Sequence, residues 1–279
     1  QSLFGVRTDL KFGKTNVTAV FSEQRSQSQQ IVSQGGGSIQ EFEIFALDYE
    51  EDRHYFLSQY FRDQYDSALE TYPYINSNVQ ITRIEVWVTN RGSQTQNIRN
   101  IIALQDLGES QKEKTGIGSV IENFFQSDGI RVLPDNGTNK LDPKLIDKGG
   151  ILNENIRDIA SVKSGFGAVE SKFREGIDYA VLESARKLDK NEYNLNSRLG
   201  YISLNQRLSN DEVLSVAYQY THNGRVYQVG EFANGSIPGT SVSTLPDQEP
   251  ELENNSLITK LLKSNITDVS QPVWDLMMK

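Results

Sequence analysis

The sequence predicts a mainly β protein that carries an inserted α+β domain. Two segments of alternating apolar and polar residues, Leu3–Arg25 and Leu199–Phe232, each have the pattern of antiparallel β-hairpins. They flank a long middle segment, from Glu41 to about Arg198, in which apolar residues also recur at helical spacing. This order is expected when a β scaffold accepts a second domain between two of its hairpins.

The first hairpin is predicted from a period-two pattern. Arg7, Asp9 and Lys11 fall on one face of its first strand, and the short polar segment Gly13–Asn16 supplies a turn. The apolar residues of this strand fall on the opposite face, which would face lipid in a membrane-spanning barrel: Phe4, Val6, Leu10 and Phe12.

The second hairpin segment repeats this plan. Ile202 and Leu204 alternate with polar residues, Ser209–Glu212 is predicted to be a turn, and His222–Gly224 contains the Asn-Gly pair that favours primed hairpin turns. The return strand supplies three further candidates for a lipid-facing stripe: Leu214, Val216 and Tyr218.

Alternation alone leaves two architectures open. Outer-membrane barrels combine short periplasmic turns with long extracellular loops, which would suit the long middle segment. A soluble β-sandwich has half-buried strands that alternate in the same way. Because each barrel strand gives a weak signal, the pattern by itself favours the soluble sandwich.

Composition narrows the function classes. The 279 residues carry a formal net charge of −9, which argues against nucleic acid as a partner because phosphate recognition needs clustered Lys and Arg. The absence of cysteine excludes disulfides, thiolate catalysis and Cys-ligated metals. No apolar run approaches the roughly 20 residues of a transmembrane helix, so we expect any membrane contact to be made by strands. The chain starts at Gln1 without an apolar leader, and we expect a mature or excised piece.

Four segments are expected along the chain. Residues 1–40 form a barrel-type hairpin and a flexible Gln/Ser/Gly-rich loop, and residues 41–198 form the inserted α+β domain. Residues 199–235 form barrel-type hairpins, and residues 236–279 form a polar loop and a C-terminal segment.

The inserted domain is expected to have its own core. Its main elements are a helix at Asp52–Glu70 and a hairpin at Val79–Leu104, and a short strand at Glu41–Phe45 precedes them. Short helices are also expected at Ser119–Phe125 and Pro143–Asp147, and a longer helix is expected at Asn153–Lys163. The core candidates are aromatic residues of the helix and the hairpin, which are more often buried than ligand-binding: Phe56, Tyr60, Phe61 and Trp87.

The residues give no constellation for covalent chemistry, so we expect no enzyme, no cofactor and no metal. The two histidines, His54 and His222, cannot form a His-rich metal site. The acidic run Asp48–Asp52 is typical of a helix N-terminus, and its neighbouring carboxylates do not face each other across a cleft as a glycosidase requires. The segment Asp135–Asp142 spaces oxygen ligands as calcium loops do, but it lacks the bidentate Glu and reads as turn sequence.

Longer blocks of sequence carry a family resemblance. The blocks follow one another from Phe56 to the C-terminus, and the segment Ser110–Lys190 contains none of them. They are Phe56–Asp63, Gln80–Asn90, Thr95–Asn100, Leu199–Asn205, Val226–Phe232, Thr259–Lys263 and Trp274–Lys279. In these blocks the chain resembles the SprA/Sov family, the outer-membrane translocons of the type IX secretion system that are associated with gliding motility.

The resemblance reverses the preference for a sandwich. It implies that the chain is one part of a very large outer-membrane β-barrel, and that this barrel carries folded cargo proteins to the cell surface. The implied partners are other segments of the same translocon, other secretion-system components, cargo proteins and membrane lipid. The implied role is structural or gating, with the energy supplied by partners.

Two other function classes stay open at this point. A soluble extracellular module that binds carbohydrate could use Trp87 or the Tyr-rich helix as a stacking platform. A carboxylate hydrolase could use the Asp48–Asp52 run. If the barrel interpretation is right, the two short turns and the long excursion between Phe21 and Leu199 predict that the inserted domain lies on the extracellular side.

Overall fold

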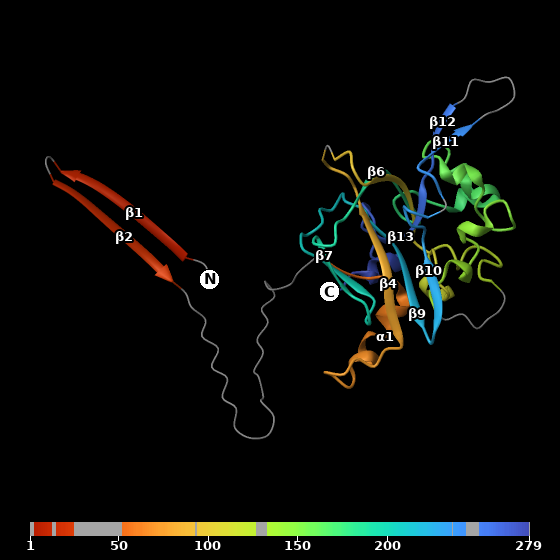
Figure 1. Ribbon diagram of the computed structural model, residues 1–279, viewed down its shortest axis with the longest axis horizontal. Helices are drawn as coiled ribbons and strands as arrows, with labels where there is room; N and C mark the ends of the chain where they lie inside the picture. Colours follow the sequence, from red (N-terminus) through yellow and green to blue (C-terminus); the bar gives the residue numbers. More distant parts are fainter. Residues whose placement is uncertain are drawn as a thin grey trace. The chain divides into compact units, whose positions relative to one another are not determined.

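The chain forms two compact units, residues 1–48 and residues 49–279, in the computed structural model (Figure 1). The structure describes residues 3–12, 15–24, 52–92, 94–126, 133–235, 237–243 and 251–278. The predicted loop at Ser26–Gln40, the predicted strand at Glu41–Phe45 and the residues Asp48–Glu51 of the acidic run lie outside the described residues.

The described part of the first unit is one antiparallel hairpin. Strands β1 (Leu3–Phe12) and β2 (Thr15–Gln24) each have ten residues. Their register pairs Val6 with Phe21 and Leu10 with Val17. The middle parts of the two apolar stripes read from the sequence are therefore opposite each other, and the predicted hairpin is confirmed.

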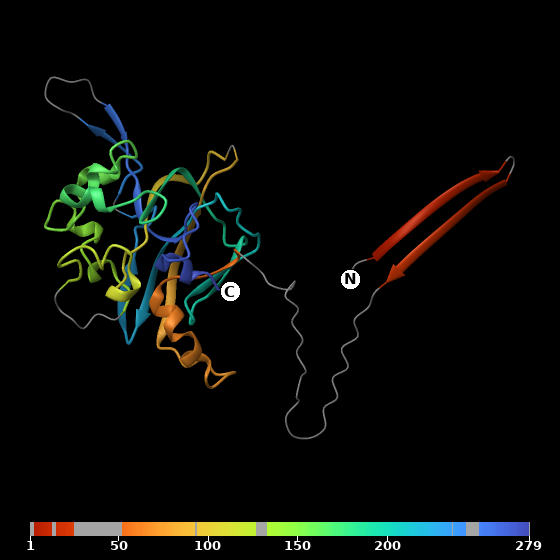
Figure 2. The ribbon, with the colours of Figure 1, turned by 180° about the vertical axis from the view of Figure 1, so that it is seen from behind.

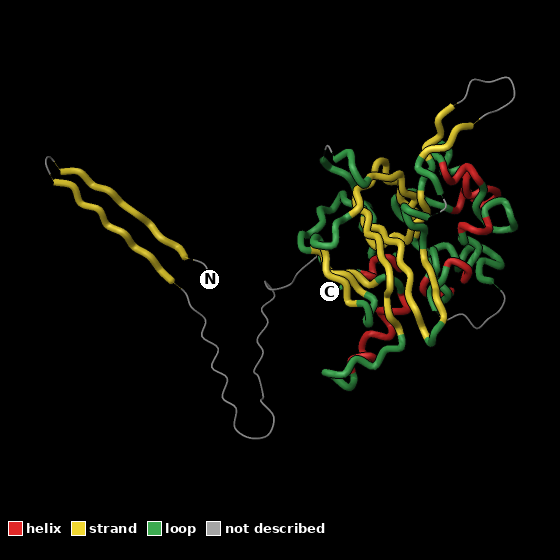
Figure 3. The backbone as a smooth tube through the Cα atoms, in the orientation of Figure 1, coloured by secondary structure: helices red, strands yellow, loops and turns green. Residues whose placement is uncertain are grey.

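The second unit is built around a small closed barrel, whose strands are among those drawn in yellow in Figure 3. Around the barrel the strands follow one another in the order β9, β13, β5, β6 and β4, and β4 pairs again with β9. Their bounds are β4 Val79–Val88, β5 Ile98–Leu104, β6 Tyr179–Lys187, β9 Leu214–His222 and β13 Leu257–Lys263. A sixth strand, β10 (Arg225–Val229), pairs with the end of β9.

Irregular steps in the register help this small barrel to close. The pairing shifts between Ile81 and Arg83 of β4, between Arg99 and Ile101 of β5, and between Leu261 and Lys263 of β13. An extra residue in one strand of a pair bends that strand and increases its twist, which a barrel of few strands requires. On β6, Ser184 adopts a positive φ of 49° at such a step, and its N–H donates to the Asn100 side chain at 2.9 Å.

A second sheet and one helix cover the barrel. The sheet consists of β3 (His54–Phe56), β8 (Tyr201–Leu204) and β7 (Tyr193–Asn196), and helix α1 spans Gln59–Leu69. Helix α1 contacts the C-terminal 3-10 helix η7 (Pro272–Leu276), and both lie on the face of the barrel that Figure 2 presents. A separate hairpin, β11 (Thr240–Ser243) and β12 (Glu251–Asn254), follows the barrel strand pair β9–β10.

Between β5 and β6 the described residues form loops and 3-10 helices, and the longer helix predicted at Asn153–Lys163 is not formed. The 3-10 helices are η2 Lys112–Lys114, η3 Asn136–Thr138, η4 Pro143–Leu145, η5 Glu154–Arg157 and η6 Ser164–Lys172. Asn and Asp side chains accept backbone N–H groups two residues ahead, as Asn153 does from Asn155 and Asp158 does from Ala160. Such local bonds compete with α-helical hydrogen bonding and explain why the predicted helices are short.

Two predicted pairings are corrected, and a third is confirmed. Strands β4 and β5 exist as expected but do not form a hairpin, because β6 lies between them in the sheet. The segment Ile202–Leu204 belongs to β8 in the smaller sheet, so Ser209–Glu212 links two different sheets and is not a hairpin turn. The predicted Asn-Gly turn is confirmed: it joins β9 to β10, with positive φ at Asn223 and Gly224.

The predicted division into domains also differs from the structure. Residues 199–235 belong to the same compact unit as residues 52–198, because β9 closes the barrel by pairing with β4 along its whole length. The predicted helix at Asp52–Glu70 begins only at Gln59, and the residues before it form strand β3.

The aromatic core candidates lie where this unit is most buried. Phe56, Phe61 and Trp87 are at most 6% exposed, and Tyr60 is partly buried against the same core. Phe61 packs edge-on against Tyr218 and Tyr220 of the barrel, with ring centroids 6.1 and 5.8 Å apart. Helix α1 is thus fastened to the barrel by aromatic contacts.

The expected lipid-facing residues divide between the two units. Leu214, Val216 and Tyr218 are fully buried in the core of the second unit, which corrects their predicted lipid-facing position. Strand β9 has β4 on one edge and β13 and β10 on the other, so its apolar residues pack inside a closed structure. The side chains of Phe4, Val6, Leu10 and Phe12 lie outside what the structure describes.

Candidate functional site

A buried ion pair links barrel strand β13 to the segment that follows β5. Lys260 Nζ lies 2.8 Å from Glu109 Oε1, and the two side chains are only 2% and 5% exposed. Lys260 also donates to the carbonyl oxygen of Gln105, and Glu109 accepts the backbone N–H of Gln59 at 3.2 Å. A buried charge is tolerated only with such partners, so these contacts fix three separate segments to one another.

Asp106 forms a second buried charge site beside this pair. Its carboxylate accepts the backbone N–H groups of Gly116, Ile117 and Gly118 at 2.9, 2.7 and 3.2 Å. Burial raises the pKa of Asp106 to about 6, although these N–H groups and the charge of Lys260 act in the opposite direction. The carboxylate thus holds the Gly116–Gly118 turn against the end of β5.

The segment considered as a calcium loop uses its polar side chains internally. Asn139 Nδ2 donates to the carbonyl oxygens of Asp106 and Glu109 at 2.7 and 2.9 Å. Asn136 accepts the N–H of Gly230 at 2.8 Å and donates back to its carbonyl oxygen at 3.4 Å. Among the described residues, no group of three or more His, Cys, Asp or Glu side chains is placed to hold a metal ion.

A third charged contact stabilises the connection between β10 and β13. The Arg157 guanidinium donates two hydrogen bonds to the Glu231 carboxylate, at 2.5 and 2.8 Å, and also donates to the Ser256 carbonyl oxygen at 3.1 Å. Glu231 in turn accepts the N–H of Ile258 at 2.9 Å. Because these charged groups are largely buried and hydrogen-bonded to neighbouring segments, we interpret the networks as structural.

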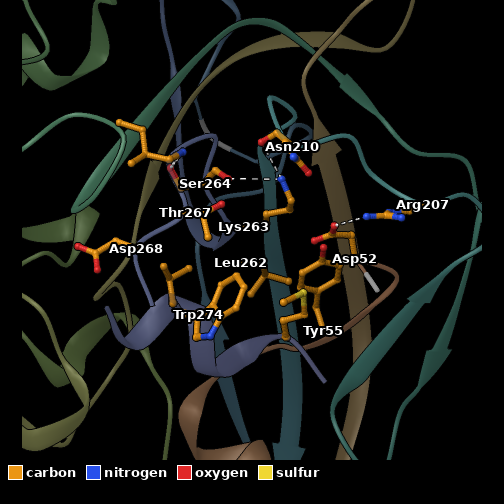
Figure 4. Close-up of a pocket in the computed structure, with 13 residues that line it drawn as sticks. Asp52, Tyr55, Arg207, Asn210, Leu262, Lys263, Ser264, Thr267, Asp268 and Trp274 are labelled. Atoms are coloured by element: carbon orange, nitrogen blue, oxygen red, sulfur yellow. Dashed lines mark hydrogen bonds and ion pairs between the residues drawn. The ribbon is translucent and has the colours of Figure 1, made fainter. Parts of the chain in front are cut away.

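A surface cleft of about 360 Å³ lies beside β3, β13 and helix η7 (Figure 4). Apolar and polar side chains share its lining. The lining residues are Asp52, Tyr55, Arg207, Asn210, Leu262, Lys263, Ser264, Ile266, Thr267, Asp268, Val273, Trp274 and Met277.

The charged groups of this cleft are held in place by neighbouring groups. Lys263 Nζ donates to the carbonyl oxygens of Ser209, Asn210 and Glu212 at 3.0, 3.1 and 2.9 Å, and burial lowers the pKa of Lys263. Arg207 forms an ion pair with Asp52 at 3.6 Å.

Tyr55 lies next to this ion pair and is fully buried. Burial, followed by the nearby Asp52 carboxylate, raises the pKa of the Tyr55 hydroxyl far above its ordinary value. The hydroxyl therefore stays neutral at physiological pH and presents a hydrogen-bonding group and not a charge.

The histidines noted in the sequence lie apart from this cleft. His54 Nδ1 is 2.8 Å from Ser203 Oγ within the smaller sheet, and His222 ends β9 opposite Val79. The one described member of the acidic run, Asp52, belongs to the cleft through its ion pair with Arg207.

Sequence reasoning missed the buried charges. Lys260 interrupts the apolar run Leu257–Lys263, and a lysine inside a buried strand needs an anionic partner. That position was the available signal, but nothing in the sequence indicates which carboxylate pairs with it. The position of Trp274 within the cleft was also not anticipated.

No helix among the residues that the structure describes has the length and apolar character needed to cross a membrane.

Comparison with known protein families gives one match. The family model SprA_N, described as motility related/secretion protein, matches residues 1–223 of the 279-residue chain. The match covers the β1–β2 hairpin and most of the barrel unit, and it confirms the resemblance read from the sequence. No curated protein matches the chain.

We predict that Asp106 makes stability depend on pH. Because its folded-state pKa is about 6 and its ordinary value is 3.8, the folded state loses stability as the pH rises through this window. The loss should be about 3 kcal/mol, and it should be absent in Asp106→Asn. Urea unfolding at several pH values between 4 and 7 measures it. Asp66→Asn, which changes an exposed carboxylate, should keep the wild-type profile; an unchanged profile in Asp106→Asn would contradict the assignment.

Proposed function

The chain belongs to the SprA_N family of motility-related and secretion proteins, and we propose that it is a structural and gating segment of a protein-conducting translocon in the bacterial outer membrane. In this proposal the complete translocon exports folded cargo proteins by type IX secretion and supports gliding motility. The family match over residues 1–223 is the observation that carries the proposal. The proposed role is not enzymatic and requires no cofactor.

The β1–β2 hairpin supports a membrane-spanning role for the first unit. Each strand has ten residues, and a transmembrane β-strand needs about 9–11 residues to cross the hydrocarbon core. The register places Val6 opposite Phe21 and Leu10 opposite Val17, which would give the middle of the hairpin an apolar face toward lipid. The proposed neighbours of this hairpin are other strands of the same translocon.

The second unit supports the gating part of the proposal. Its barrel is closed by β4 and β9, and its interior is filled by apolar side chains, so it is a packed domain and not a conduit. A rigid domain that is attached to a membrane strand through a linker can cover or narrow the mouth of a wide channel. Cargo proteins and other secretion components are its proposed partners.

The connection of the hairpin suggests on which side of the membrane the second unit lies. Only two residues separate β1 from β2, and barrels of this kind place short turns in the periplasm. The open end of the hairpin would then be extracellular, and the second unit follows from that end. We therefore propose an extracellular position for the second unit.

The alternative of a carbohydrate-binding module loses one of its two candidate stacking platforms. Trp87 is 1% exposed and packs in the core, so it offers no stacking platform to a ligand. The hydrolase alternative has no further observation in its favour, because the described residue of its acidic run, Asp52, is paired with Arg207.

The first test of the proposal changes the two faces of β1. Val6→Arg places a charge on the proposed lipid face and should destabilise the inserted hairpin by about 2–4 kcal/mol near the bilayer midplane. The expected result is loss of the translocon from the outer-membrane fraction and loss of cargo secretion. Arg7→Ser, on the proposed lumenal face, is the matched control and should have little effect. Equal tolerance of both changes would argue against a membrane-spanning hairpin.

The second test uses the absence of cysteine in the chain. A membrane-impermeant thiol reagent applied to intact cells should label Lys148→Cys, because Lys148 is exposed on the second unit. It should label Lys11→Cys, which is exposed near the tight turn of the hairpin, only after the outer membrane is permeabilised. Labelling in the reverse order would place the second unit in the periplasm.

A further inference from the structure

We propose that the cleft beside η7 is a binding site for a neutral saccharide. This inference concerns a site of the second unit and does not depend on the role proposed for the translocon. It rests on the combination of an aromatic and aliphatic floor with a rim of fixed polar side chains.

The floor of the cleft is apolar. Leu262 and Val273 are buried beneath it, and Tyr55 and Met277 border it from the smaller sheet and the C-terminal segment. The ring of Trp274 points toward the centre of the cleft in Figure 4, and this side chain is only partly buried. An indole face that is open to a cleft can stack against the C–H face of a pyranose ring.

The rim of the cleft carries both signs of charge in equal number. Its two carboxylates are Asp52 and Asp268, and its two cations are Arg207 and Lys263. The formal charge of the rim is therefore zero, which favours a neutral ligand over an anion or a cation. Asn210 and Thr267 add an amide and a hydroxyl to the same rim.

The rim groups are also positioned before a ligand arrives. Asp268 accepts hydrogen bonds from the Ser270 backbone and hydroxyl at 3.0 and 2.6 Å, and Lys263 is held by three carbonyl oxygens of residues 209–212. Polar groups that are already ordered lose little conformational entropy when a ligand binds. Carboxylate, guanidinium and amide groups can each form two parallel hydrogen bonds, which suits the neighbouring hydroxyls of a sugar.

The size of the cleft sets the size of the ligand. A volume of about 360 Å³ lies at the lower end of the range for small-molecule sites, roughly 300–1,000 Å³, and would admit about one or two sugar rings. Longer saccharides would extend over the rim.

The backbone around the cleft favours a saccharide over an extended peptide. Strand β3, which brings Tyr55 to the cleft, pairs with β8 on one edge. On the other edge, Tyr55 pairs with Met277, and the N–H of Met278 donates to the His54 carbonyl oxygen at 2.9 Å. A peptide that adds to a sheet needs an unpaired edge, and β3 has both edges occupied.

The chain offers a selective probe for this site. It contains two tryptophans: Trp87 is 1% exposed in the core, and Trp274 lines the cleft. A ligand that stacks in the cleft should change the emission of Trp274 and leave that of Trp87 unchanged. The full chain would be titrated with maltotriose, cellotriose, tri-N-acetylchitotriose and methyl mannoside, all of them neutral, with binding measured independently by ligand-observed saturation-transfer NMR.

We expect saturable binding of at least one of these saccharides, with a fluorescence change that disappears in Trp274→Phe. By NMR, Trp274→Ala and Arg207→Ala should each weaken binding at least about tenfold. Arg207→Ala changes a half-exposed side chain and keeps the test valid if Trp274→Ala unfolds the protein. Tyr74→Ala, at an exposed aromatic residue outside the cleft, is the matched control and should bind normally.

Three outcomes would overturn the proposal. The first is the absence of saturable binding by every saccharide in the series. The second is binding that Arg207→Ala leaves unchanged, which would place the ligand elsewhere. The third is a Trp274 response that an apolar peptide produces and no saccharide produces, which would make the cleft a protein-docking site.

Discussion

The ion pair between Lys260 and Glu109 is the contact on which the arrangement of the second unit depends. Lys260 stands in the middle of β13, a strand that pairs with β5 on one side and β9 on the other. Removing its ammonium group from water is costly unless an anion and further acceptors compensate. Glu109 and the Gln105 carbonyl oxygen supply that compensation and draw the segment after β5 over the barrel.

Other polar contacts extend from this point into the irregular part of the chain. Asp106 binds the Gly116–Gly118 turn, and Asn139 binds the carbonyl oxygens of Asp106 and Glu109. The region between β5 and β6 has few regular elements, so it depends on these specific hydrogen bonds more than the barrel does. Asp106 makes part of that dependence sensitive to pH, because burial holds its pKa near 6.

Local features could be predicted from the sequence. The β1–β2 hairpin and the Asn223-Gly224 turn depend on neighbouring residues, and period-two alternation with turn chemistry was enough to find them. The closure of the barrel depends on pairings between distant strands, such as β4 with β9 and the insertion of β6 between β4 and β5. Alternation does not encode those partners. For the same reason, the stripe Leu214–Tyr218 resembled a lipid face although it packs in a protein core.

The candidate site was harder to predict than the fold. Its side chains come from Asp52, from residues near 207–210 and from the C-terminal segment, and only the three-dimensional structure brings them together. The family match is consistent with a role in secretion or motility, and the two units suit different parts of the proposed translocon. The hairpin has the length of a membrane-spanning pair of strands, and the packed barrel unit offers a rigid surface with a cleft.

A double-mutant cycle on Lys260 and Glu109 tests most directly whether the second unit depends on this buried pair. Urea unfolding of Lys260→Met, Glu109→Leu and the double variant gives the coupling energy between the two residues. We predict that each single change lowers the free energy of unfolding by about 3–5 kcal/mol, because it leaves one buried charge without its partner. The double variant should recover much of that loss. Single changes with small effects that simply add in the double variant would contradict the account.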